Sequence, residues 1–290
     1  MIKEIIGKWI KPNGISLLLA AQNEEKTIRM CVESFLEFSD EIIIVTNGST
    51  DNTRKICGEL VEEYSEKVYF YDQPQLADLY QNRAFALTKA KYRWVAKFDA
   101  DFVAYTEEDE ELSILNLRKK ILNTTPFWLI SFKVGLINIY RTLKECGLDI
   151  KIEKKIYIAP PFTAMHKIFL NTPLLAFKRV GRWEHIPFNR LYWKKNTKGV
   201  SFFHLTLNSD ATLFRRSERT NWRERGDFKT YPTLDHYIDI YVLPIKYQTT
   251  LENAIKRYIN NDIEPYLQEY KEELYYRYPK ILRRIIDNEV

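Results

Sequence analysis

The first hundred residues alternate short apolar runs with stretches whose apolar side chains recur every three or four positions. Four runs have the length and composition of strands buried on both faces, at residues 15–20, 41–46, 67–71 and 94–98. Three stretches between them have helical periodicity, at residues 25–38, after residue 51 and at residues 76–90. This alternation predicts an α/β fold, a mostly parallel sheet with helices on both faces.

The pattern changes after residue 101, where the alternation stops. Residues 106–125 predict an acidic loop followed by a helix, and residues 127–205 mix strand-like runs with prolines. Residues 207–228 are rich in arginine, and helical spacing returns from Thr250 onward. Because the sequence shows no flexible linker, we expect this tail to pack on or beside the main domain.

The composition is that of a folded chain with a mild positive charge. With 290 residues and 45% hydrophobic positions, the chain can form one large domain or two small ones. The 44 Lys and Arg exceed the 39 Asp and Glu by five. This excess fits an anionic small-molecule substrate or a weak attraction to a membrane surface, and it does not require nucleic acid.

The cysteines and the amino-terminal residues suggest a reducing compartment. Cys31, Cys57 and Cys146 show neither C-x-x-C spacing nor a disulfide framework. The first nine residues lack the apolar core of a signal peptide, and the apolar residues 127–140 are too few to span a bilayer. We therefore expect a cytoplasmic protein, with peripheral attachment to the inner face of a membrane as an alternative setting.

Residues 95–101, which read VAKFDAD, end an apolar strand with two carboxylates one residue apart. Positions i and i+2 of a strand point to the same side, so Asp99 and Asp101 are expected to converge. Converging carboxylates repel each other unless a divalent cation or a shared proton lies between them. The structural alternative is an acidic turn that ends the strand. Ligands of parallel sheets bind at this edge, outside the carboxyl ends of the strands.

Three segments, in this order and spacing, resemble family-2 glycosyltransferases with the GT-A fold. The matching segments are residues 15–28, which resemble the opening strand, loop and helix; residues 42–53, which resemble the second strand and its Asp-Gly-Ser-x-Asp-x-Thr loop; and residues 82–84, Trp94 and residues 99–101, which resemble the approach to the metal-binding Asp-x-Asp. The resemblance implies a Rossmann-like sheet flanked by helices and the transfer of a sugar from a nucleotide-sugar donor.

The first two loops are implied to hold the nucleoside. By resemblance, Ala20, Gln22 and Glu24 enclose the nucleobase and ribose, although Glu24 could also cap the following helix. Asn47 stands where the family usually has an aspartate that contacts the base, and asparagine keeps an acceptor, adds a donor and removes a charge. Uridine is the expected base. We expect Asp51 to cap a helix.

The resemblance also implies a divalent metal site. Asp101 is the expected direct ligand of Mn²⁺ or Mg²⁺, and Asp99 is expected to bind the ribose or a metal-bound water. A bound cation of this kind would neutralise the departing diphosphate. A late histidine completes the metal site in several such enzymes, which makes His204 the candidate third ligand, with a packed core histidine as the alternative. Arg83 is expected to contact the donor or to pair with a neighbouring acid.

The catalytic base must come from the second half of the chain, where the resemblance is weak. Glu184 is the candidate that would deprotonate the acceptor hydroxyl, with His185 and Asp109 as alternatives. A basic cluster after His204 could bind the diphosphate or form a solvated helix face; its members are Arg215, Arg216, Arg219, Arg223 and Arg225.

These observations predict three parts and one activity. Residues 1–105 are expected to form the nucleotide-sugar half of a GT-A domain, residues 106–210 its acceptor half, and residues 211–290 a helical extension. The predicted activity is an inverting, metal-dependent transfer of sugar from a UDP-sugar to a saccharide, lipid-linked or protein acceptor, in a setting such as surface-polysaccharide synthesis. A catalytically degenerate module that binds sugars or membrane surfaces is the alternative.

Overall fold

The computed structural model describes residues 11–76, 78–107, 112–126, 128–148, 161–180 and 183–288, which fall into two compact units. Unit 1 comprises residues 1–137, 162–205 and 272–290, and unit 2 comprises residues 138–161 and 206–271. Unit 1 therefore combines three separate segments of the chain, and unit 2 combines two.

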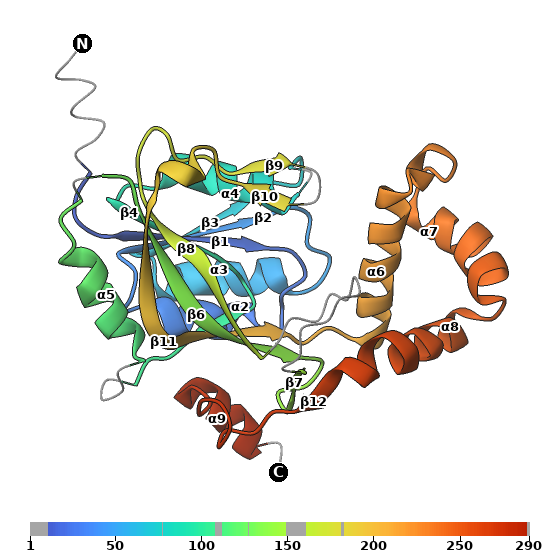
Figure 1. Ribbon diagram of the computed structural model, residues 1–290. Coiled ribbons are helices and arrows are strands. Elements are labelled where there is room, and N and C mark those ends of the chain that lie inside the picture. Colours follow the sequence, from blue (N-terminus) through green and yellow to red (C-terminus); the bar gives the residue numbers. More distant parts are fainter. Residues whose placement is uncertain are drawn as a thin grey trace. The chain divides into compact units, whose positions relative to one another are not determined.

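Unit 1 is built on a mixed sheet whose parallel strands form one side and end at β3 (Figure 1). The strands run in the order β6-β8-β4-β1-β2-β3, with bounds Ile130–Tyr140, Phe162–Leu170, Trp94–Asp99, Ile15–Ala21, Glu41–Thr46 and Val68–Asp72. Strands β4, β1, β2 and β3 pair in parallel, whereas β8 pairs antiparallel to both β4 and β6. The predicted parallel sheet is thus confirmed, and the second half of the chain adds its antiparallel side.

Two further strands bring a distant segment to the end of β4. Strand β5 (Phe102–Ala104) pairs antiparallel with β11 (Trp193–Thr206), so that His204 faces Phe102 in the register. Strand β11 also pairs with β6, and a Cβ built on Gly135 would lie 2.3 Å from the carbonyl oxygen of Gly199. Glycine is therefore required where the two backbones approach most closely.

Helices cover both faces of this sheet. The helices of the first half are α2 (Ile28–Phe35), α3 (Thr53–Glu63), α4 (Leu79–Lys89) and α5 (Ile114–Leu122), and α9 (Lys280–Asn288) follows near the carboxyl end. Alternate residues of β1 point to opposite faces: Leu17 and Leu19 belong to the core under α2, α3 and α5, and Leu18 belongs to the core under α4. Because both faces are buried, the strands are apolar throughout, as the sequence pattern indicated.

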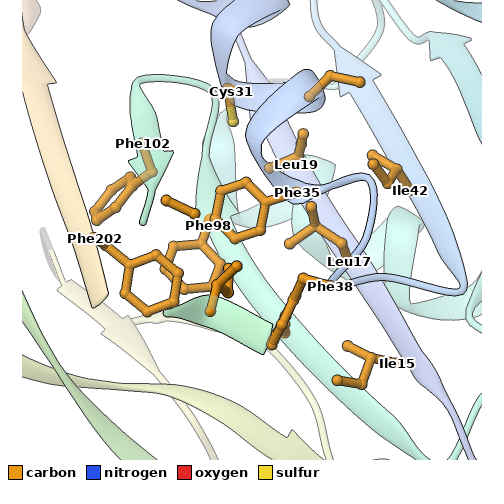
Figure 2. Close-up of a cluster of buried hydrophobic side chains, with 14 of the residues drawn as sticks. Ile15, Leu17, Leu19, Cys31, Phe35, Phe38, Ile42, Phe98, Phe102 and Phe202 are labelled. Atoms are coloured by element: carbon orange, nitrogen blue, oxygen red, sulfur yellow. The ribbon is translucent and has the colours of Figure 1, made fainter. Parts of the chain in front are cut away.

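The larger core is rich in phenylalanine (Figure 2). The rings of Phe35 and Phe202 stack at 5.6 Å between centroids, and Phe98 lies 4.6 Å from Phe202. This contact joins a helix of the first half to β11 and to the strand that carries Asp99. Each of these rings is fully buried. The end of β4 therefore lies on a rigid support.

Unit 2 is mainly helical. Its helical elements are α6 (Asp210–Glu224), α7 (Leu234–Tyr237), the π-helical segments η3 (Ile238–Tyr247) and η4 (Ile259–Ile263), and α8 (Leu251–Tyr258). Strand β7 (Glu145–Gly147) pairs with β12 (Leu267–Glu269). Its core packs Phe214 against Tyr247 and Tyr258, and the fully buried Glu218 accepts from Lys246 Nζ at 2.5 Å. None of the helices within the described ranges combines the length and the hydrophobicity needed to cross a membrane.

Candidate active site

The Asp-x-Asp lies where β4 ends and β5 begins, at the carboxyl edge of the parallel strands. Asp99 is the last residue of β4, and Asp101 directly precedes β5. The antiparallel register brings His204 to this point, and its Nε2 lies 3.2 Å from Oδ2 of Asp101. The backbone N–H of Leu205 donates to the carbonyl oxygen of Asp101 at 2.8 Å. Two of the three predicted metal ligands are thus neighbours.

The Asp101 carboxylate has the features of a cation ligand. Asp101 is only 7% exposed, and its Oδ1 is buried without a hydrogen-bond partner among the described residues. An unpaired buried carboxylate oxygen is costly unless a cation or a donor reaches it. Adjacent ligands of an octahedral Mg²⁺ lie about 3 Å apart, close to the separation of Asp101 Oδ2 and His204 Nε2. The spacing of these two atoms therefore suits joint coordination of a divalent ion by Asp101 and His204.

Asp99 has a different environment from Asp101. Its Oδ1 accepts a hydrogen bond from Nη2 of Arg83, on α4. Burial alone would raise the pKa of Asp99, but Arg83, together with Lys167, His204 and Lys97, lowers it to about 2. No group of three His, Cys, Asp or Glu side chains within the described part of the chain is arranged to hold a metal. In this structure Asp99 is accordingly an ion-pair partner of Arg83.

Glu184, the predicted base, is bound to two cations. It lies on β10 (Trp183–His185), which pairs with β9 (Lys178–Val180). Its Oε1 accepts from Arg83 Nη1 at 2.7 Å, and its Oε2 contacts Nζ of Lys97. Arg83, which is only 4% exposed, thus bridges Glu184 and Asp99. Of the two alternatives, His185 has an exposed side chain, and Asp109 lies outside the described residues.

Two buried lysines complete the charge distribution, and the sequence reasoning missed both. Lys97 and Lys167 are 9% and 6% exposed. Burial lowers the pKa of Lys167 to about 8, with Arg83 acting in the same direction and Asp99 and Asp101 opposing it. Burial also lowers the pKa of Lys97, with Arg83 and Lys167 acting in the same direction and Asp99 opposing them.

A signal for Lys97 was present in the sequence. It precedes Asp99 by two positions, so the period of the strand places both on one side. A cation inside a strand that is otherwise buried and apolar requires an acidic partner, as Glu184 proves to be. Lys167 has no comparable signal, because its place beside Phe102 follows from the antiparallel β8.

The predicted nucleoside loops are joined to each other by hydrogen bonds. Gln22 Nε2 donates to the backbone oxygen of Asn47 at 3.1 Å, and Asn82 Nδ2 donates to Asn47 Oδ1 at 3.0 Å. The Glu24 carboxylate accepts from Thr27 Oγ1 at 3.0 Å, and it does not cap α2, whose N-cap residue is Thr27. Ala20 is buried within β1, where its carbonyl accepts from the N–H of Ala100. Asn82 therefore positions Asn47, a role that the sequence did not indicate.

Further bonds fix the shape of the first loop. Asn23 adopts a left-handed φ of 58°, and its Oδ1 accepts from the backbone N–H of Thr50 at 2.8 Å. Asp51 accepts from the N–H groups of Thr53 and Glu25, whereas Asn52 holds the N-cap position of α3. These bonds explain why α2 begins only at Ile28, and not at residue 25 as predicted. These loop residues form hydrogen bonds with each other and with the second loop, so the helix begins only after them.

Comparison with known proteins identifies the first part of the chain. Residues 16–113 match the model of glycosyl transferase family 2. A poly-beta-1,6-N-acetyl-D-glucosamine synthase of Staphylococcus epidermidis is 27% identical over 183 residues, which are 59% of this chain and 42% of the synthase. The chain thus matches less than half the length of that relative.

Solved structures of similar arrangement share little sequence with the chain. S. aureus TarS 1–349 in complex with UDP is 15% identical, with a TM-score of 0.41 over 85% of this chain and 78% of that one. The mannosyltransferase PcManGT from Pyrobaculum calidifontis, in complex with GDP-Man and Mn²⁺, is 13% identical, with a TM-score of 0.43 over 88% and 77%. The matched segment 16–113 holds the parallel strands, both loops and the Asp-x-Asp, and in this segment the chain is similar to glycosyl transferase family 2.

Proposed function

We propose that this chain transfers a sugar from a nucleoside diphosphate sugar to an acceptor hydroxyl, with a divalent cation held by Asp101 and His204. The observation that carries the proposal is the buried Oδ1 of Asp101, which lies beside His204 at the carboxyl edge of the parallel sheet and has no hydrogen-bond partner in the part of the chain that the structure describes. A bound Mg²⁺ or Mn²⁺ would stabilise the negative charge that develops on the departing diphosphate. The loop residues Gln22 and Asn47 lie on neighbouring strand ends, where a nucleoside would bind.

Arg83 and Asp99 form the second part of the proposed donor site. The ion pair fixes the Asp99 carboxylate in its ionised form, which suits an acceptor of ribose hydroxyl hydrogen bonds. Arg83 is held from its other side by Glu184, so its guanidinium is oriented before the donor arrives. Such preorganisation avoids ordering costs at the moment of reaction.

Glu184 is the predicted catalytic base, and we propose the anchoring of Arg83 as its main role. Its two ion pairs, with Arg83 and Lys97, occupy both oxygens of the carboxylate. A general base needs an oxygen within hydrogen-bond reach of the acceptor hydroxyl. The acceptor is proposed to be a saccharide, in line with the named product of the Staphylococcus epidermidis synthase.

A screen for nucleotide release tests the proposal directly. The full chain is incubated with a panel of UDP- and GDP-sugars, with Mn²⁺, with Mg²⁺ or with EDTA, and released nucleoside diphosphate is measured. We expect metal-dependent release with at least one donor, and its loss in Asp101→Asn. The matched control is Asp235→Asn, an equal change of charge at an exposed carboxylate of unit 2.

The alternative is a degenerate module that binds a nucleotide sugar without turnover. Asn47 in place of the family's aspartate is the observation in its favour. Calorimetric binding of UDP without any release from a UDP-sugar, with or without acceptor, would select this alternative. Absence of both binding and release across the panel would contradict the donor site itself.

A further inference from the structure

Unit 2 encloses a cavity that the proposed transferase chemistry does not use. The cavity has a volume of about 360 Å³, within the range of small-molecule sites. Its lining comes from β6, β11, α6, α8 and η4, all within unit 2: Tyr140, Arg141, Thr206, Leu213, Arg216, Ser217, Arg219, Thr220, Tyr258 and Ile263. Five separate elements thus shape one space.

The interior of the cavity is apolar and its rim is basic. Tyr140, Tyr258 and Ile263 are between 6% and 8% exposed and provide apolar surface inside. Arg216 and Arg219, three positions apart on α6, have exposed side chains. Residues three apart on a helix project from the same side, so both guanidinium groups can reach one ligand.

Neither of these two arginines forms a contact ion pair with an acid among the described residues. Arg141, also in the lining, forms ion pairs with Asp210 and with Glu264. For Arg216 and Arg219, by contrast, the described residues supply no side-chain ion pair or hydrogen bond within contact distance. Partial burial lowers the pKa of Arg219, and the charges of Arg223, Arg215 and Arg216 lower it further, whereas the charge of Asp235 opposes this shift. An anion placed between the two guanidinium groups would relieve this repulsion.

We propose that this cavity binds a lipid phosphate, with its phosphate between Arg216 and Arg219 and its apolar chain against Tyr140, Tyr258 and Ile263. A phosphate oxygen pair matches the planar donor fork of arginine. The apolar interior favours a lipid phosphate over a free inorganic anion, which has no apolar chain. The basic rim favours it over a neutral amphiphile, which has no charge. The site is a binding site of unit 2, and it is independent of the donor site in unit 1.

Calorimetry with a short amphiphile tests the proposal without any sugar donor. Octyl phosphate, below its micelle concentration, is titrated into the full chain, and octyl glucoside and inorganic phosphate are the two comparison ligands. We expect octyl phosphate to bind about tenfold or more tightly than either one. Equal binding of octyl glucoside, or equal binding of inorganic phosphate, would overturn the assignment of a lipid phosphate.

Variants of one helix locate the site. Arg216→Gln with Arg219→Gln is expected to weaken octyl phosphate binding about tenfold to a hundredfold. The control is Arg215→Gln on the same helix, which removes the same charge from a residue that lies outside the lining and pairs with Asp235. Equal weakening by the control would show general electrostatic attraction and overturn the proposal.

Two further measurements test the site without the double variant, which could unfold. Thr220→Trp fills the cavity from α6 while keeping both arginines, and it should abolish binding. Sedimentation with phosphatidylcholine vesicles, with and without phosphatidic acid, asks whether a membrane is the source of the lipid. Phosphatidic acid should increase binding of the native chain, and unchanged octyl phosphate binding in Thr220→Trp would contradict the cavity as the site.

Discussion

The Nε2 of His204 lies 3.2 Å from the Oδ2 of Asp101, although the two residues come from opposite halves of the chain. The pairing of β11 with β5 produces this proximity, since His204 faces Phe102 in the register. The same pairing sets the ring of His204 on that of Phe102, with 4.5 Å between centroids. The orientation of the imidazole is therefore fixed by the strand and by the ring beside it.

Replacement of His204 by asparagine should weaken both metal binding and turnover. Asparagine cannot supply the imidazole nitrogen beside Asp101, so we expect kcat/KM to fall about a hundredfold and Mn²⁺ affinity to fall with it. Electron paramagnetic resonance of Mn²⁺ titrations, run beside the nucleotide-release assay, measures both. His185→Asn, at an exposed histidine, is the control; unchanged Mn²⁺ affinity in His204→Asn would remove His204 from the proposed site.

The pH profile of Glu184→Gln distinguishes two roles of Glu184, holding Arg83 in place and acting as the catalytic base. Glutamine keeps the shape but loses the ion pairs with Arg83 and Lys97, so we expect kcat/KM to fall about tenfold. The acidic limb of the pH–rate curve should persist, because an anchor does not transfer the proton. A loss of about a thousandfold together with disappearance of that limb would instead identify Glu184 as the catalytic base.

The carboxylate of Asp40 should link the stability of unit 1 to acid pH. It accepts from two nitrogens of Arg118 at 2.8 Å each and from the N–H of Ile15. Burial opposes ionisation, but the bonds from Arg118 and Ile15 hold the pKa of Asp40 below its usual value. Because the folded-state pKa is depressed, this stabilisation is complete above about pH 4, the unfolded value, and is lost as the pH falls through the folded value.

Asp40→Asn should therefore lower the free energy of unfolding by about 1–3 kcal/mol at neutral pH. The difference in free energy of unfolding between the native sequence and Asp40→Asn should shrink below about pH 4. In this range Asp40 of the unsubstituted chain becomes protonated in the unfolded state. Urea denaturation across this pH range measures the effect, with the exposed Asp235→Asn as control. A difference that stays constant down to pH 2 would show that the ion pair with Arg118 is not its source.

The buried ion pair of unit 2 should be essential to its packing. Glu218 is fully buried, and Lys246 is its cation. Glu218→Gln leaves the ammonium group of Lys246 without a countercharge, and we expect a loss of about 3–5 kcal/mol in the stability of this unit. Glu224→Gln, at an exposed position of the same helix, should change stability by less than about 0.5 kcal/mol. Hydrogen exchange of α6 and α8 amides reports this loss, and equal protection in both variants would contradict it.

The parallel part of the fold could be read from the sequence because its strands are buried on both faces. The observed β1, β2 and β4 agree with their predicted ranges to within one residue. The start of α2 could not be predicted as closely, because Asn23 and Glu25 form hydrogen bonds with residues around Asp51 and not with the helix. Such bonds depend on a second loop, which local periodicity does not contain.

The candidate site could be predicted in part. The residues at strand ends, Asp99 and Asp101, follow from the period of one strand, whereas the proximity of His204 depends on a strand register that no local pattern sets. The buried Lys167 and the bridge through Arg83 depend on β8 and β10 of the second half. In that half, short strands and connecting loops replace the regular alternation, so the pairing partners could not be derived.

The register of β5 and β11 has a consequence for how the chain acquires metal affinity. Asp101 and His204 can share a cation only after a contact between residues far apart in sequence has formed, and such contacts form slowly during folding. An ion that binds the pair binds the completed sheet and not the unfolded chain, so it adds to the stability of the native state by mass action. The cation would then stabilise the pairing of β11 with β5 as well as bind the donor.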